Sequence, residues 1–118
     1  MDYDKNNVFA KIIRKELPCE FVDENKNAFA FKDISPKAPV HILVIPKKEY
    51  INFDDFISNA LEEEIIDFYA LINKIIIKLD LTNKGYRIIT NSGKDGNQDV
   101  PHLHFHLLAG KNLGFMIS

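Results

Sequence analysis

The sequence predicts an α+β domain: an antiparallel sheet of about five strands packed with one long helix and one short helix. Short apolar runs of strand-like composition are separated by connections of hairpin length. One longer segment carries apolar side chains at helical spacing. The 118 residues are enough to bury a core of their own, and we expect residues 1–118 to form a single domain.

The N-terminal part is expected to hold the short helix and the first strands. Residues 8–16 place apolar side chains at helical spacing up to Pro18, and the polar residues 1–7 are expected to form a flexible tail. Three further runs are expected to form strands. They are residues 21–22, 28–31 and 40–45. A charged turn between the first two predicts a hairpin, and the third is apolar on both faces, which predicts a covered central strand.

The long helix is expected over residues 59–80. Its apolar side chains recur at steps of three and four, and Asn59 followed three residues later by Glu62 resembles a capping box. Residues 86–90 are expected to form the next strand, and a polar loop with two glycines then leads to a histidine-rich strand. Residues 111–118 are expected to form a C-terminal tail.

Three histidines at alternate positions are the strongest functional signal in the chain. His102, His104 and His106 are separated by apolar residues, and in a strand successive side chains point to opposite faces. The three imidazoles are therefore expected to line one face. The fourth histidine, His41, lies within the central apolar run. Imidazole is the side chain most readily neutral and nucleophilic near neutral pH, so this face is a candidate reaction site.

Three interpretations of the histidine run are open on the residues alone. The rings could be packed without a chemical role. They could bind a metal ion, although the outer two lie too far apart along a straight strand to share one ion, and Asp99 is the only nearby carboxylate. They could act in nucleophilic or acid–base catalysis, which needs a neutral imidazole oriented through its other nitrogen. Three histidines in register, flanked by core residues, favour catalysis.

The composition excludes several other classes of function. A net charge of −2 gives no general attraction to nucleic acid or to an anionic membrane, so neither is expected as a partner. A single cysteine, Cys19, excludes an internal disulfide and a multi-cysteine metal site. The polar N-terminus does not resemble a signal peptide, and no apolar run is long enough to span a membrane. We expect a cytoplasmic protein without a cofactor.

The run from His102 to Leu108 resembles the defining motif of the histidine triad (HIT) family, His-x-His-x-His followed by two apolar residues. Other stretches are similar to the Hint branch of that family, in the same order along the chain. They are residues 9–18, 30–41, 42–47, 84–87 and 93–100. This resemblance extends over residues 8–110. It implies the HIT-like fold and a homodimer.

The resemblance also implies an activity: hydrolysis or transfer at the α-phosphate of nucleoside monophosphate conjugates, of the purine nucleoside phosphoramidate type. By similarity, His104 attacks phosphorus and forms a nucleotidyl-histidine intermediate that water then breaks. His102 orients His104, and His106 donates to the non-bridging phosphate oxygens. His41 matches the fourth histidine of the family and is expected close to His104. This chemistry requires no metal, and none is expected.

Several residues match the nucleotide contacts of the family. Asp33 matches the residue that holds the ribose hydroxyls, although aspartate at this position also suits a turn. Four apolar residues match the walls of the base pocket, although on sequence alone they would simply be core. They are Val8, Phe9, Phe31 and Ile34. Asn91 and the backbone amides around Val100 are candidate donors to the phosphoryl oxygens, together with His106.

Three departures from the family pattern bear on specificity. Asn7 and Ala10 stand where some bacterial relatives have the two cysteines of a zinc site, so that site is not expected. Asp99 stands where the best-known Hint proteins have a serine that assists the leaving group. A carboxylate cannot donate unless it is protonated, so either Asp99 turns away or the preferred leaving group differs. The C-terminal tail lacks the usual Trp-Pro-Pro-Gly ending, with Phe115 at the tryptophan position.

Three other functions remain as alternatives. The chain could hydrolyse dinucleoside polyphosphates, although the residues after the triad are more similar to Hint proteins. It could be a nucleotide-binding module with little catalysis, which the altered Asp99 and tail favour and the intact triad opposes. It could use the histidine run to bind a divalent metal. The sequence does not distinguish adenine from guanine.

Overall fold

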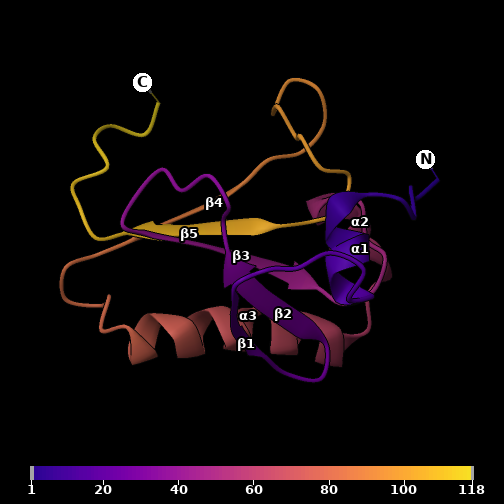
Figure 1. Ribbon diagram of the computed structural model, residues 1–118, viewed down its shortest axis with the longest axis horizontal. Coiled ribbons are helices and arrows are strands. Elements are labelled where there is room, and N and C mark those ends of the chain that lie inside the picture. The colour runs from indigo at the N-terminus through magenta and orange to yellow at the C-terminus, as the bar shows by residue number, and fades with distance from the viewer. Residues whose placement is uncertain (1, 118) are drawn as a thin grey trace.

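The computed structural model describes residues 2–117, and they form one antiparallel sheet of five strands with the order β1-β2-β3-β5-β4 (Figure 1). This confirms the predicted α+β class and the antiparallel five-stranded sheet. In chain order the elements are α1 (Val8–Ile13), β1 (Phe21–Glu24), β2 (Ala28–Lys32), β3 (Val40–Pro46), α2 (Phe53–Asn59), α3 (Glu62–Lys78), β4 (Arg87–Thr90) and β5 (Phe105–Ala109).

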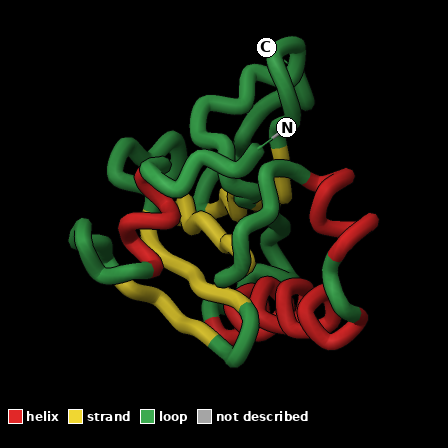
Figure 2. Tube along the Cα trace, turned by 90° about the vertical axis from the view of Figure 1, so that its right-hand side faces the viewer, coloured by secondary structure: helices red, strands yellow, loops and turns green. Residues whose placement is uncertain are grey.

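Strand β3 occupies the centre of the sheet, as its apolar sequence predicts. It pairs antiparallel with β2 on one side and with β5 on the other. Ile42 and Val44 pack into the larger core cluster, which also contains the buried face of α3. Leu43 and Ile45 pack into a second cluster with Phe9 of α1. Side chains of β3 alternate between the two clusters because successive residues of a strand point to opposite faces, and Figure 2 shows the strands between the helices.

The long helix differs from its prediction at its N-terminus. Helix α3 begins at Glu62, and the capping interaction is made by Glu64, whose carboxylate accepts the backbone N–H of Leu61 at 2.9 Å. The predicted box between Asn59 and Glu62 is wrong because Asn59 belongs to the preceding helix and donates its side-chain amide to Asp55. The buried Tyr50 completes the cap by donating its hydroxyl hydrogen to the Glu64 carboxylate at 2.7 Å.

Helix α2 is an element that the sequence did not predict, since the expected long helix starts at residue 59, where α2 ends. The side chain of Asn52 caps it by accepting the backbone N–H of Asp55 at 2.9 Å. Ala60 then adopts an extended conformation, with φ −76° and ψ 154°, and interrupts the helical path before α3. The described residues therefore contain two short helices and one long one. None of these helices has the length and apolar character needed to cross a membrane.

The histidine run does not form one straight strand. Strand β5 begins at Phe105, so His106 alone lies within it, whereas His102 and His104 precede it. The backbone N–H of His102 bonds the carbonyl of Val100 at 2.8 Å, which turns the chain just before β5. The expectation that one strand carries all three imidazoles is therefore wrong, because β5 starts only at Phe105 and leaves the first two histidines before it.

Both terminal segments contact the rest of the protein. Asn7 is buried, and its side chain caps α1 by accepting the backbone N–H of Ala10 at 2.9 Å. The α1 helix ends at Ile13 and not at residue 16, since Lys15 adopts a positive φ of 63°. At the other end, Arg87 donates to the carbonyl of Gly114 at 2.7 Å. The flexibility expected for residues 1–7 stays a prediction.

Candidate active site

His104 is held by its own chain through one ring nitrogen. Its Nδ1 lies 2.7 Å from the carbonyl oxygen of His102. A carbonyl can only accept, so the proton of the neutral ring is on Nδ1 and the lone pair is on Nε2. The nearest charged group to Nε2 is Asp99, whose Oδ1 lies 3.5 Å away. His104 is therefore buried at 2% exposure with an unshared nitrogen lone pair.

His102 has both ring nitrogens in hydrogen bonds. Its Nε2 lies 2.9 Å from the carbonyl of Pro46, at the end of β3, and so carries the proton. Its Nδ1 accepts from the hydroxyl of Tyr3 at 2.5 Å. The residue is fully buried, and neither nitrogen can reach a substrate. His102 orients His104 through its backbone carbonyl, while its side chain anchors that stretch of backbone.

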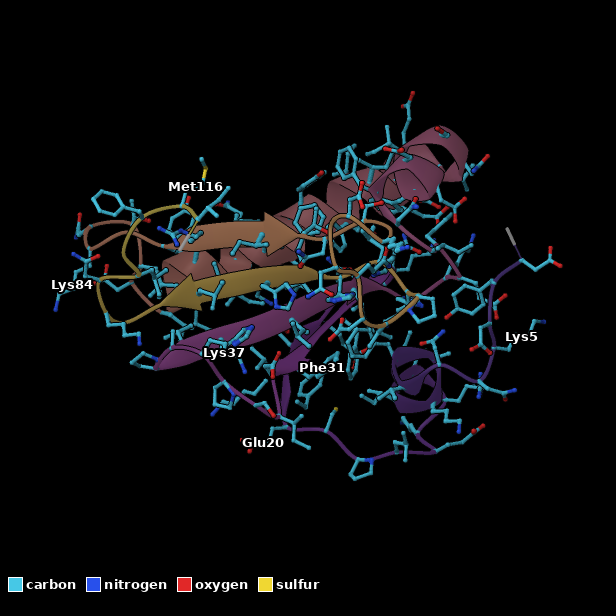
Figure 3. The ribbon with its side chains drawn as sticks, turned by 90° about the horizontal axis from the view of Figure 1, so that it is seen from above. Lys5, Glu20, Phe31, Lys37, Lys84 and Met116 are labelled. Carbon is cyan, nitrogen blue, oxygen red and sulfur yellow. The ribbon has the colours of Figure 1, made fainter. Side chains whose placement is uncertain are left out.

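A second chain of hydrogen bonds determines which ring nitrogen of His106 carries the proton. The backbone N–H of Lys37 donates to Nδ1 of His41 at 3.0 Å, so the neutral ring of His41 carries its proton on Nε2. That N–H faces Nδ1 of His106 at 2.9 Å. His106 therefore accepts at Nδ1 and presents an N–H donor at Nε2. Figure 3 labels Lys37, in the segment that leads into β3.

Burial keeps His41, His102 and His106 neutral. Burial, together with the neighbouring His104, lowers the pKa of His102 to about 4 against the opposing effect of the Pro46 hydrogen bond. Burial likewise lowers the pKa of His106 to about 4, with added effects of His104 and His41. The pKa of His41 is lowered by burial, against the opposing effect of Asp33. Since a buried cation loses its hydration, the neutral rings and their directed N–H groups persist at neutral pH.

Together these bonds leave one nucleophile and one donor. Among the four histidines, only His104 has a ring nitrogen with a lone pair that no protein N–H or O–H occupies. The rings of His104 and His106 lie edge to face, with their centroids 5.1 Å apart. A group attacked by His104 Nε2 would thus lie within reach of the His106 N–H. This is the arrangement needed for nucleophilic attack with stabilisation of the developing negative charge.

The predicted base-pocket residues divide into two kinds. Phe9 and Phe31 are buried and meet edge to face at 5.5 Å, and Phe9 also packs on the ring of His104 at 4.9 Å. Ile34 is 97% exposed and Val8 is 49% exposed, so their alternative reading as core residues is wrong. Each exposed residue lies within three positions of one of these phenylalanines along the chain, which makes the four residues a candidate apolar surface for a base.

The residues predicted to make polar contacts with the nucleotide lie close to the histidines or form hydrogen bonds within loops. Asp33 lies 3.4 Å from Nε2 of His41, and its other oxygen accepts the backbone N–H of Ser35, so it also serves the turn. Asn91 donates its side-chain amide to the carbonyl of Gly96 at 2.8 Å, which orders the preceding loop. The backbone N–H of Val100 donates to the carboxylate of Asp99 at 2.9 Å, so it is occupied by the protein itself.

Sequence reasoning did not find Tyr3, Gln98 or the carbonyl of Pro46 as parts of the site. Gln98 donates to the carbonyls of Ile51 and Val100, at 2.7 and 3.0 Å. These bonds connect the loop of residues 91–98 to the segment after β3. Gln98 lies in a stretch that resembles the family, which is a usable signal. Tyr3 has no such signal, because a tyrosine in a polar N-terminal segment looks like solvent-exposed chain.

One group of side chains in residues 2–117 has the composition of a metal site. Asp33, His41 and His106 offer ligand atoms that all lie within 4.8 Å of one another. However, the two imidazole nitrogens are 2.9 Å apart and share a proton. Two nitrogens on one tetrahedral zinc ion would be roughly 3.3 Å apart and both unprotonated. A metal would therefore have to separate this pair and displace its proton.

Comparison with known proteins identifies the family. The HIT domain family matches residues 14–113 of the chain. The protein belongs to this family. An uncharacterised 13.2 kDa HIT-like protein of Azospirillum brasilense is 50% identical over 116 residues, which cover 98% of this chain and 95% of that protein.

Solved structures of the family have the same fold. A HIT family hydrolase from Clostridium thermocellum superimposes with a TM-score of 0.83 at 42% identity, covering 98% of this chain and 99% of that one. A histidine triad nucleotide-binding protein from Candida albicans gives a TM-score of 0.75 at 32% identity, covering 86% of this chain and 73% of that one. The chain is thus a hydrolase-like HIT protein, and its family includes nucleotide-binding members.

The lowered histidine pKa values predict that acid destabilises the fold. Below pH 6.5, the histidines of the unfolded chain bind protons, whereas His102 and His106 stay neutral in the fold until about pH 4. The free energy of unfolding should therefore fall as the pH drops from 6.5 to 5, by up to about 1.4 kcal/mol per pH unit for each such histidine. Urea unfolding at several pH values measures this slope.

The variant His106→Asn is the matched control, because it removes one of the two groups and should reduce the slope by about one histidine equivalent. An unfolding free energy that does not change between pH 6.5 and 5 would contradict the neutral assignment.

Proposed function

We propose that the protein hydrolyses nucleoside monophosphate conjugates at the α-phosphate, with purine nucleoside phosphoramidates as the substrate type and a cytoplasmic location. The observation that carries this proposal is the single free imidazole lone pair, on Nε2 of His104, beside the N–H donor of His106. A HIT family hydrolase and a histidine triad nucleotide-binding protein among its structural relatives support the reaction class and the ligand class.

The reaction proceeds in two displacements at phosphorus. His104 Nε2 forms a bond to the α-phosphorus as the bond to the leaving amine breaks, and the leaving nitrogen takes a proton from solvent, which the attacking water returns in the second step. Water then attacks the nucleotidyl-His104 intermediate and releases the nucleoside monophosphate and the free histidine. In both steps the N–H of His106 donates to a non-bridging oxygen, where charge accumulates. The carbonyl of His102 stabilises the positive charge of the ring through Nδ1–H.

The nucleotide would bind across the apolar surface and Asp33. The purine ring packs against Phe9 and Phe31, with the exposed side chains of Val8 and Ile34 at its edge. The carboxylate of Asp33 accepts hydrogen bonds from the ribose hydroxyls. Asn91 and the segment at Val100 line the phosphate side, where the second amide hydrogen of Asn91 is a further donor.

The substitution His104→Ala tests the covalent mechanism. We expect turnover of an adenosine phosphoramidate to fall by about a thousandfold or more, because no other histidine has a free nitrogen to replace the nucleophile. AMP binding, measured by calorimetry, should persist, since the nucleotide contacts remain. Rapid quenching and mass spectrometry of the wild type should detect an AMP adduct on His104.

Substantial hydrolysis by this variant would refute the covalent mechanism. A wild type that binds AMP but turns over no conjugate would instead identify a nucleotide-binding module. Activity that is lost in chelator and restored by a divalent ion would favour the metal-dependent alternative.

Asp99 favours amines over phosphate chains as leaving groups. Its carboxylate faces the nucleophile, with Oδ1 at 3.5 Å from His104 Nε2, so it has not turned away from the site. A polyphosphate leaving group would bring several negative charges near this carboxylate, at a cost of about 1 kcal/mol per charge pair at 4 Å in water and more in a partly dry site. An amine carries no such charge. The position of Asp99 thus supports phosphoramidates against dinucleoside polyphosphates.

The substitution Asp99→Asn tests this preference. We expect kcat/KM for a diadenosine polyphosphate to rise relative to that for an adenosine phosphoramidate or an adenylated lysine, by about tenfold, as the repulsion is removed. The substitution Asp95→Asn removes an exposed charge from the same loop and should leave the ratio unchanged. An unchanged ratio in Asp99→Asn would show that this carboxylate does not select the leaving group.

We also propose that the protein is a homodimer that pairs through the β4 edge of the sheet and the neighbouring side of α3. Strand β4 is the last in the sheet order, and Ile88 on it is 42% exposed. On α3, Ile66 and Ile77 are 65% and 64% exposed. They share one stripe with Tyr69, which packs on Phe105 of β5, the strand next to β4. An open strand edge beside apolar residues is a natural pairing surface.

The dimer predicts a solution mass of twice the 13.6 kDa chain. Replacing Ile77 by Glu should shift sedimentation toward the monomer, because a charge in the apolar interface is desolvated without a partner. The substitution Leu17→Glu places the same charge on an exposed residue away from the stripe and should leave the mass unchanged. A monomeric wild type would refute the dimer.

A further inference from the structure

Tyr3 lies outside the residues that match the family, 14–113, yet its side chain reaches the histidine site. Its hydroxyl oxygen is 2.5 Å from Nδ1 of His102, across 99 positions of sequence. The two rings also meet edge to face, with centroids 5.6 Å apart. The segment that carries Tyr3 passes Lys5, labelled in Figure 3, on its way to α1. The contact is thus a specific one between the N-terminal segment and the site.

The direction of this hydrogen bond follows from its neighbours. His102 Nε2 carries the ring proton because it faces the carbonyl of Pro46, so Nδ1 can only accept and Tyr3 must donate. Burial raises the pKa of Tyr3, which keeps the hydroxyl protonated at neutral pH. Because His102 is fully buried, water cannot substitute for the hydroxyl.

We propose that Tyr3 is a positioning residue for the nucleophile: it holds the ring of His102, and thereby the carbonyl of His102 that keeps the proton on Nδ1 of His104. The proposal rests on the proposed function insofar as His104 is the nucleophile. The hydroxyl of Tyr3 bonds His102 and not the nucleophile His104. It acts through two hydrogen bonds in series. The first joins Tyr3 to the His102 side chain, and the second joins the His102 backbone carbonyl to His104.

The packing of the N-terminal segment supports this role. Phe9 of α1 meets the rings of both His102 and His104 edge to face, with centroids at 6.4 and 4.9 Å. Tyr3 and Phe9 therefore both pack against the ring of His102. Without the Tyr3 hydroxyl, Nδ1 of His102 would be a buried acceptor with no donor, and the ring could regain one only by moving. Such a movement would carry the His102 carbonyl away from His104.

The experiment is a comparison of Tyr3→Phe with the wild type, using full-length protein. Phenylalanine keeps the ring packing and removes only the donor. We expect kcat for an adenosine phosphoramidate to fall about tenfold while KM changes less than twofold, because the nucleotide contacts are intact. In histidine ¹⁵N NMR, the Nδ1 resonance of His102 should shift toward that of an unbonded acceptor, and the Nδ1–H signal of His104 should shift or broaden.

The control Asn25→Ala removes hydrogen bonds to Ala28 and Asp67 at the β1–β2 turn, away from the histidines. It should lower the unfolding midpoint without changing kcat or the His104 signal, which separates a loss of stability from a loss of positioning. If Tyr3→Phe alters His102 but leaves both kcat and the His104 signal unchanged, Tyr3 is only structural and the proposal fails. If the His102 resonance does not move, the hydrogen bond is absent in solution and the proposal fails.

The NMR measurement also separates this proposal from the proposed function. If the wild type hydrolyses no conjugate, the proposed function fails, and the positioning role is then judged by the His104 Nδ1–H signal alone. A perturbed His104 Nδ1–H signal in Tyr3→Phe, with a normal signal in Asn25→Ala, supports the positioning role. Equal signals in the two variants overturn it.

Discussion

The hydrogen bond from His104 Nδ1–H to the carbonyl of His102 is the interaction on which the site depends. It decides which nitrogen of His104 carries the lone pair, and so which atom can attack. It also requires the His102 carbonyl to be placed accurately, which the His102 side chain achieves by bonding the Pro46 carbonyl at the end of β3. Two hydrogen bonds in series thus fix the position of the reactive nitrogen relative to the central strand of the sheet.

Strand β3 organises both halves of the histidine constellation. Near its start, His41 receives the Lys37 N–H and turns its own N–H toward His106. At its end, Pro46 receives the N–H of His102. The pairing of β3 with β5 brings these ends to the correct histidines, since His41 lies opposite Leu108 and Leu43 opposite His106. A central strand is well suited to this task because it is bonded on both sides and covered on both faces.

Burial of the imidazoles has both a cost and a use. Each buried ring nitrogen needs a partner, and both nitrogens of His41 and His102 have one, as does Nδ1 of His106. Meeting that requirement assigns a unique proton position to His41, His102 and His106, so the rings cannot exchange roles. Burial also lowers the pKa of His102 and His106 to about 4, which preserves those positions at neutral pH. The same requirement makes His104 Nε2, with only Asp99 nearby, distinct from the other ring nitrogens.

Much of the fold and part of the site follow from the sequence by itself. Periodicity along the chain is enough to predict the strands, the apolar face of the long helix and the importance of the four histidines, because these properties depend on neighbouring residues. The same reasoning missed α2, began the long helix at residue 59 instead of 62, and extended the histidine strand too far. Local propensity does not reveal that Asn59 bonds backward to Asp55, or that the chain turns at Val100 before β5 begins.

Only the tertiary structure decided what each histidine does. The partners that assign the protons are far away in sequence: Pro46 is 56 positions from His102, His106 is 65 from His41, and Tyr3 is 99 from His102. No local pattern encodes such pairs. The sequence alone determined that this is a histidine-bearing antiparallel domain. The packing of β3, β5 and the N-terminal segment decided that His104 Nε2 holds the free lone pair, because a proton's position on an imidazole is set by the groups that fold against it.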